Sequence, residues 1–280
     1  MTAFLPFIQS FAKYDPALVE SIIAGYTAIM ESGDTTLTEG SAYIKNTVEQ
    51  ATAIYDTIIN LTDREWNDHK ILLSRDDHYI AYRFDEIGGI KRFVVMADRK
   101  RGNGYRGIYG TMKATNDPAI VLPMVDDDMW NMWDMHDFVF APDDIKSRLR
   151  AMKPTTIHEI THMIDDKVGG GYNKFQMSDK SAQKLVPEYR LKNWEYDGLP
   201  DKVVADEVQY VNKPTEFNAR FIAGVENAIN MGHTKSFADF SRSMRENTQI
   251  GSVLHVLTPD NKKRYQKWLY QAYEIIKAKI

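Results

Sequence analysis

The 280-residue chain contains no cysteine. This absence excludes disulfides, thiolate metal sites and cysteine nucleophiles, so any bound metal must be held by histidine and carboxylate ligands. The chain also lacks a run of about 20 apolar residues, which is the length needed to cross a bilayer. Its first residues contain neither a basic segment nor a long apolar segment, so we expect no secretory signal. These absences predict a soluble, unexported protein with no membrane partner.

An excess of positive charge is missing as well. The formal net charge is −4, with 35 basic and 39 acidic side chains. A global electrostatic attraction to the phosphates of nucleic acid is therefore not expected. Hydrophobic residues make up 43% of the chain, which is enough for a substantial core in a globular protein of this length.

Hydrophobic spacing predicts helices at both ends of the chain and a sheet between them. Apolar residues recur at helical intervals over residues 16–61, with a break at residues 32–34, so we expect a helical hairpin within residues 1–65. Alternating and compact apolar segments punctuated by glycine predict a small, mostly antiparallel sheet over residues 70–125. Residues 119–122 lie between Pro118 and Pro123, and because proline donates no backbone hydrogen bond we expect an edge strand there.

The second half of the chain is predicted to be helical again. The expected helices cover residues 143–152, a segment that begins at Pro154 and Thr155 and ends at glycines 169–171, residues 214–230, residues 234–246 and residues 259–280. Residues 172–208 are expected to be loop-rich, and the segment 169–209 to shape substrate access. This order of elements indicates an α+β fold, with residues 1–65 as a helical region and residues 66–280 as one domain.

The segment His158-Glu159-Ile160-Thr161-His162 is an HExxH motif inside one of the predicted helices. Because a helical turn takes about 3.6 residues, His158 and His162 project from one face and can grip one ion. Apolar neighbours flank both histidines, which predicts a buried helix, and buried histidines require a partner or a metal. Zinc suits two neutral imidazoles, and Glu159 is placed to activate a zinc-bound water as general base. We therefore expect one zinc ion per chain.

The third ligand must come from elsewhere. The extended pattern HExxHxxGxxH requires glycine at 165 and histidine at 168, whereas this chain has Asp165 and Val168. Asp165 lies three residues after His162, and so short a side chain fits an orienting role better than ligation. Glu216 lies in the first turn of the predicted helix 214–230 and is the better candidate. The alternative role for Glu216 is to complement the dipole of that helix.

The histidine motif followed by Glu216-Phe217-Asn218-Ala219-Arg220-Phe221 resembles the gluzincin metallopeptidases. The second stretch is similar to the peptidase domain of anthrax lethal factor and its relatives, which include the Pro-Pro endopeptidases. The Tyr-x-x-x-Pro-x-Glu arrangement from Tyr210 to Glu216 also resembles metallopeptidase domains encoded by bacteriophages and mobile elements. The resemblance covers roughly residues 115–230. It implies a zincin-like fold, His158, His162 and Glu216 as zinc ligands, and a sheet whose edge strand binds extended peptide. It also implies a tyrosine that steadies the oxyanion.

Tyr210 is the nearest upstream tyrosine to Glu216 and is the expected oxyanion residue, with Tyr172, Tyr189 and Tyr196 as competitors. The expected function is a zinc-dependent metalloendopeptidase acting on a protein or peptide, in the cytoplasm or associated with a virion. The alternative is a catalytically silent protein that keeps a zincin fold, for example a phage virion or assembly component. Glu159 favours catalysis, because a silent protein does not need the base.

Overall fold

The structure is a computed structural model that describes residues 34–71, 79–88, 90–98, 107–112, 117–123, 142–169, 177–191, 193 and 196–278. The chain divides into two compact units. One unit comprises residues 49–168, and the other is made from two segments, residues 1–48 and 169–280. Helix α3 (Asp34–Asn60) contributes to both units. The helix predicted before residue 32 lies outside the described residues.

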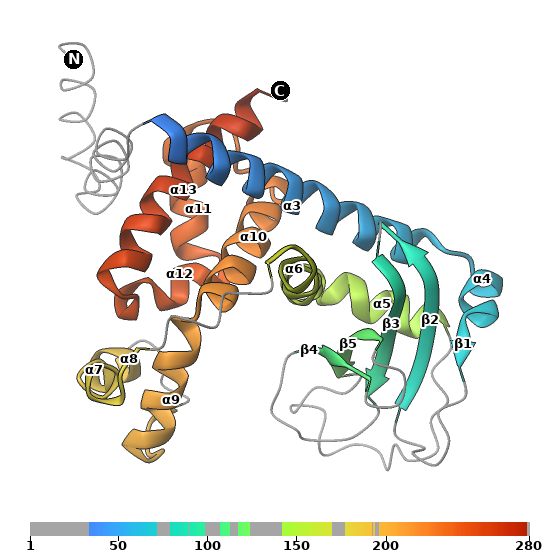
Figure 1. Ribbon diagram of the computed structural model, residues 1–280, viewed down its shortest axis with the longest axis horizontal. Coiled ribbons are helices and arrows are strands. Elements are labelled where there is room, and N and C mark those ends of the chain that lie inside the picture. The colour runs from blue at the N-terminus through green and yellow to red at the C-terminus, as the bar shows by residue number, and fades with distance from the viewer. Residues whose placement is uncertain are drawn as a thin grey trace. The chain divides into compact units, whose positions relative to one another are not determined.

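The unit of residues 49–168 contains a five-stranded sheet in the order β1-β2-β3-β5-β4. Its strands are β1 (Lys70–Ile71), β2 (Tyr79–Ile87), β3 (Ile90–Asp98), β4 (Ile108–Thr111) and β5 (Pro118–Pro123). The nine-residue strands β2 and β3 are the longest (Figure 1). Only the β3–β5 pair is parallel among the described strands. The α+β class and the mostly antiparallel sheet are therefore confirmed.

The prediction that residues 119–122 form an edge strand was wrong. Strand β5 lies between β3 and β4, and β4 occupies the edge. The two prolines are the first and last residues of β5, where a missing N–H does not interrupt the ladder, and the four residues between them are free to pair on both sides. On this side of the sheet the edge is instead formed by β4, which precedes β5 in the sequence.

One face of the sheet packs against helix. Trp66 from α4 (Asp63–Asp68) is fully buried and meets the rings of Tyr82 and Phe84 edge-on, with centroids 4.7 and 5.6 Å apart. Phe84 also stacks on Phe93, its cross-strand partner. Residues two apart in a strand share a face, so this alternation forms the aromatic side of the core. Edge-to-face aromatic contacts of this kind stabilise the packing beyond the area that they bury.

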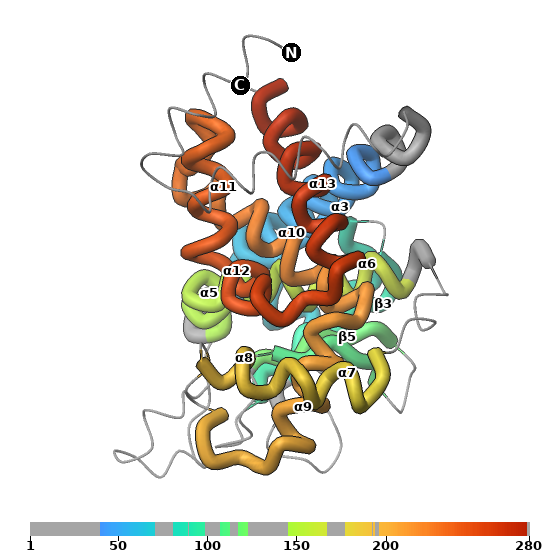
Figure 2. The backbone as a smooth tube through the Cα atoms, turned by 90° about the vertical axis from the view of Figure 1, so that its left-hand side faces the viewer, coloured from blue at the N-terminus to red at the C-terminus, as the bar shows by residue number. Residues whose placement is uncertain are grey.

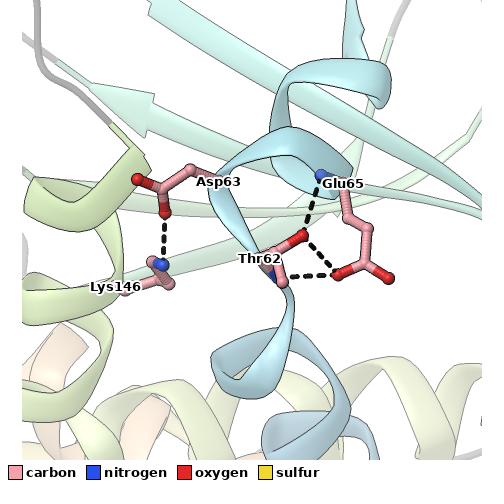
Figure 3. A network of polar contacts seen from close by, with 4 residues as sticks. All are labelled: Thr62, Asp63, Glu65 and Lys146. Atoms are coloured by element: carbon pink, nitrogen blue, oxygen red, sulfur yellow. Dashed lines mark hydrogen bonds and ion pairs between the residues drawn. The ribbon is translucent and has the colours of Figure 1, made fainter.

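Helix α4 is held in place by local polar contacts (Figure 3). The Thr62 hydroxyl accepts a hydrogen bond from the Glu65 backbone N–H, and the Glu65 carboxylate accepts one from the Thr62 backbone. This capping box satisfies two backbone donors that the start of a helix otherwise leaves open. Lys146 of α5 (Pro142–Ala151) forms an ion pair with Asp63, which ties α4 to α5. Tyr55 of α3 donates to the backbone oxygen of Leu149 and fixes the other side of α5.

The remaining described helices belong to the second unit. They are α7 (Asp179–Gln183), α8 (Val186–Arg190), α9 (Asp201–Val211), α10 (Pro214–Asn230), α11 (Phe237–Glu246), α12 (Gln249–Val253) and α13 (Pro259–Lys277), with a 3-10 turn at Leu254–Val256. Helix α10 contacts α9, α11, α12 and α13 (Figure 2). The helix predicted over residues 214–230 is confirmed with the same bounds.

The prediction that residues 172–208 are loop-rich was wrong for the described part, because α7, α8 and most of α9 lie there. The signals are local and short. The Ser178 side chain caps α7 by accepting from the Ser181 N–H, and Pro187 stands in the first turn of α8. Arg190 then ties α8 to the start of α9 by an ion pair with Asp201. Five-residue helices carry too little periodicity to be recognised from apolar spacing alone.

Two sets of contacts fix α10 within its unit. The buried rings of Phe217 and Phe221 lie 5.6 and 5.3 Å from Trp268 of α13. Just before α10, the buried Asn212 accepts from the Thr258 N–H at the start of α13. The Asn261 side chain donates to the Asn212 backbone oxygen. These bonds anchor the start of α10, where Glu216 lies. Among the described residues, no helix is both long and apolar enough to span a membrane.

Candidate metal centre

The predicted motif helix is α6 (Lys153–Gly169), and it lies in the unit of residues 49–168. Pro154 stands in its first turn, where a missing N–H costs no helical hydrogen bond. Ile157, Ile160 and Met163 are fully buried. The Thr161 hydroxyl donates a hydrogen bond to the Ile157 backbone oxygen. The helix is therefore buried around much of its circumference, as the apolar flanks of the motif predicted.

The two histidines of the motif converge. The Nε2 atoms of His158 and His162 lie 3.1 Å apart, and their rings meet nearly at right angles with centroids 4.7 Å apart. His158 is 6% exposed and His162 is half-buried. Ligand atoms of His158, Glu159 and His162 all lie within 4.8 Å of one another. The spacing of four residues thus brings three polar groups to one point on a buried helix.

The separation of the two nitrogens is compatible with a shared metal ion. With zinc–nitrogen bonds of about 2.0–2.1 Å and a tetrahedral angle, two imidazole ligands have nitrogens about 3.3–3.4 Å apart. The observed 3.1 Å is close to that separation. The same distance also suits an N–H···N hydrogen bond between neutral rings when no ion is bound. The two rings could therefore form a mutual hydrogen bond or share a metal ion with little change in the distance between their Nε2 atoms.

Glu159 is buried beside the edge of the sheet. A methyl group built on Gly107, directly before β4, would lie 3.0 Å from the Glu159 Oε1 atom and 2.8 Å from the Thr155 methyl group. The chain at Gly107 therefore passes so close to α6 that only a glycine fits without displacement. The structure therefore gives a steric reason for a glycine at position 107.

Tyr109 is the site residue that the sequence analysis missed. It pairs with Ile120 of β5 and stands two residues after Gly107, on the same face of β4. Its ring stacks near that of His162 at 6.4 Å, and its hydroxyl donates to the Asp166 carboxylate at 2.8 Å. Burial, and next the bond to Asp166, raise the pKa of Tyr109 above its usual range. The hydroxyl is therefore a hydrogen-bond donor at physiological pH.

Asp165 is buried on α6 at 3% exposure, but it is not part of the cluster formed by the motif residues. Three residues after His162 it is one helical turn further along, and its carboxylate does not reach the point where the two histidine nitrogens meet. The interpretation of Asp165 as an orienting residue rather than a ligand stays a prediction.

Glu216 lies in the first turn of α10, as predicted, and belongs to the other compact unit. Its carboxylate is 2% exposed and forms a 2.6 Å ion pair with Arg220, four residues later on the same helix. Burial alone would lower the pKa of Arg220, but the carboxylates of Glu216 and Glu207 outweigh burial and raise it. The enclosed carboxylate in the first turn of α10 is compatible with both the ligand role and the helix-dipole role. Glu216 as third ligand remains a prediction from the sequence.

The tyrosines predicted to stabilise the oxyanion differ from one another in burial and in contacts. Tyr210 is 40% exposed on α9, with the Lys213 ammonium 5.2 Å from its ring centre. Tyr189 is 3% exposed, meets Tyr196 edge-on and stacks on His255. Burial raises the pKa of Tyr189. Tyr172 lies outside the described residues. The described tyrosine beside the motif histidines is thus Tyr109, which comes from the sheet.

No protein-family model, no curated protein and no solved structure matches this chain, so the site is interpreted from its own residues.

Proposed function

We propose that the protein is a zinc-dependent metallopeptidase that hydrolyses peptide bonds, with Glu159 as general base. The observation that supports this most directly is the convergence of the His158 and His162 Nε2 atoms at 3.1 Å with Glu159 in the same cluster. Three residues of one buried helix supply both metal-binding nitrogens and a carboxylate. A structural zinc site instead closes all four positions with ligands and needs no additional carboxylate base.

The roles of the side chains follow from this arrangement. Zinc, when bound, acidifies a water molecule and polarises the carbonyl group of the scissile bond. Glu159 takes the proton from the attacking water and then delivers it to the departing amine. The buried position of the Glu159 carboxylate, at 6% exposure, limits competing exchange with bulk water. His158 and His162 would hold the ion through their Nε2 atoms.

Strand β4 gives the proposed site a way to hold a peptide. It is the edge strand of the described sheet and pairs only with β5. An extended peptide can add to such an edge through backbone hydrogen bonds, which bind regardless of side-chain sequence. Gly107 places the start of this edge directly beside Glu159. The proposed substrate is therefore an extended peptide segment rather than a folded surface or a helix.

The decisive experiment combines metal analysis with a cleavage assay. The purified chain is analysed for zinc, cobalt, nickel and iron, and is then incubated with a library of unstructured peptides whose products are identified by mass spectrometry. We expect one zinc per chain and cleavage that a chelator abolishes and added zinc restores. Absence of zinc that cannot be reversed by adding the metal contradicts the proposal.

Gly107→Ala tests the contact between the sheet edge and Glu159. The added methyl group would overlap Thr155 and crowd Glu159, so either the strand or the carboxylate must move. We expect kcat/KM for peptides to fall about 10- to 100-fold, because small misplacements of a catalytic group are costly. Zinc content should be unchanged.

Gly110→Ala is the matched control for Gly107→Ala. It lies on the same strand, and an added methyl group there meets no atom within 4 Å. We expect its kcat/KM to stay within about twofold of the wild-type value, since Gly-to-Ala replacement in a strand has a small effect where space exists. Equal losses of kcat/KM in both variants would show that β4 tolerates no substitution. Wild-type kcat/KM in both variants would show that the contact of Gly107 with Glu159 does not matter for catalysis.

Glu216→Gln tests the predicted third ligand. Glutamine keeps an oxygen that accepts from the partly buried Arg220, whereas alanine would remove that hydrogen-bond partner altogether and leave Glu207 as the remaining carboxylate near the charge. If Glu216 is a ligand, we expect zinc affinity to fall more than about a hundredfold, because even residues that only orient ligands cost 10- to 100-fold when replaced. Asp165→Asn should cost less. A larger loss in Asp165→Asn would transfer the ligand role to Asp165.

A further inference from the structure

The edge strand β4 meets the metal-binding helix at two points, both on one face of the strand. Gly107 packs against Glu159, and two residues later Tyr109 stacks near His162 and donates to Asp166. Ile108, between them, points to the opposite face and is 43% exposed. Both contacts lie within the unit of residues 49–168.

The two contacts also show the direction in which β4 runs relative to α6. Two residues of strand advance by about 6.6 Å. Along α6, the rise from Glu159 is about 4.5 Å to His162 and about 10.5 Å to Asp166. The Tyr109 ring lies beside the nearer residue and its hydroxyl reaches the farther one. Strand β4 therefore runs along α6 in the same direction, and the contacts of Tyr109 set the position of the strand along the helix axis.

Strand β4 is four residues long, and among the described strands it pairs with β5 alone. One further backbone bond, from the Met112 N–H to the Asp117 oxygen, closes its end. A short edge strand of this kind opens easily, because the loss of a few backbone bonds frees it. The bond from Tyr109 to a carboxylate is of the stronger, charge-assisted type. It also joins the strand to a rigid buried helix rather than to another strand.

We propose that the Tyr109–Asp166 hydrogen bond is a register clamp, which makes Tyr109 a positioning residue that holds β4, the outermost strand on that side of the described sheet, at a fixed place beside Glu159. This inference rests on the proposed function, because it assigns the clamp to substrate placement. The Tyr109 hydroxyl acts through the strand and not on the reacting atoms. Its loss therefore affects the binding of an extended peptide more than the chemical step.

The test uses the zinc-loaded full chain and four variants. Tyr109→Phe keeps the ring beside His162 and removes only the hydroxyl. Asp166→Ala removes the acceptor, whereas Asp166→Asn keeps an acceptor oxygen. Thr111→Val is the control, because Thr111 follows Tyr109 on the same face of β4 and is exposed. Backbone hydrogen exchange over residues 107–112 is measured by mass spectrometry, together with zinc affinity and with KM and kcat for an extended peptide.

We expect Tyr109→Phe and Asp166→Ala to speed exchange of β4 about tenfold, in line with the loss of one hydrogen bond to a charged group. KM should rise several-fold, kcat should change less than twofold, and zinc affinity should not change. Asp166→Asn should keep most of the protection, and Thr111→Val all of it. The double variant Tyr109→Phe with Asp166→Ala should be no worse than either single variant.

The exchange measurement separates failure of the clamp from failure of the proposed function. Unchanged exchange in Tyr109→Phe overturns the clamp whether or not the protein cleaves peptides. Faster exchange with a change in kcat rather than KM also overturns the positioning role, because the hydroxyl then acts in the chemical step. Faster exchange in a protein that cleaves no peptide supports the clamp as a structural contact and rejects the peptidase proposal on which its purpose rests.

Discussion

Replacement of Glu159 by glutamine is expected to reduce peptide cleavage about 10²- to 10⁴-fold, the range that a general base contributes. Glutamine has nearly the same shape but cannot accept a proton from water. The crowded contact with Gly107 leaves little room for a rearranged side chain, so the variant should keep the wild-type packing. The reaction is followed as kcat on a peptide identified in the library assay, with zinc content and thermal unfolding measured in parallel.

Retention of zinc is the internal control for Glu159→Gln. The histidines supply the nitrogens of the cluster, so the variant should bind metal as the wild type does. Wild-type rates in Glu159→Gln would contradict the role of Glu159 as base. A wild-type protein that binds zinc but cleaves none of the peptides would instead support the alternative of a catalytically silent protein with a metal site.

Replacement of His162 by alanine is expected to weaken zinc binding more than about a hundredfold, because it removes one of the two converging nitrogens. His162 is half-buried, so the change leaves a smaller void than truncation of a core residue. In the wild type, zinc at 100 times its dissociation constant should stabilise the fold by about 2.7 kcal/mol. The variant should show no such increase in unfolding temperature at the same zinc concentration.

His233→Ala is the matched control for His162→Ala. His233 follows α10 and pairs with Asp239 at 3.2 Å, in a partly exposed position, and it belongs to the other compact unit. Its loss should leave zinc affinity and zinc-dependent stabilisation unchanged. If both histidine variants lose zinc equally, binding is non-specific, and if His162→Ala keeps it, the ion is not held by the motif.

The cluster of His158, Glu159 and His162 was predictable because its residues lie on one helix. The four-residue spacing of His158 and His162 alone implies a shared face, and the apolar neighbours imply burial, which the structure has. The same holds for α10, whose start at Pro214 and length follow from local signals. Such inferences need no knowledge of which distant segments meet.

Tyr109 and Gly107 were not predictable in this way, because their position depends on the order of strands in the sheet. Their alternation shows that they share a face, but only the strand order shows that this face lies against α6. The sequence analysis assigned the edge to residues 119–122, on the basis of the two flanking prolines. With β5 inside the sheet and β4 at its edge, Tyr109 comes to lie beside His162. Pairing between strands is a long-range property that proline position only partly constrains.

The unit that carries the histidine pair is inserted in sequence between the two segments of the other unit. During synthesis its residues are therefore complete before the ribosome has made α7 or any later helix. Glu216 follows His162 by 54 residues. At about 5–20 residues per second, that interval lasts about 3–11 s. Both histidines are thus polymerised several seconds before the carboxylate that is predicted to join them, and the growing protein passes through that interval each time it is made.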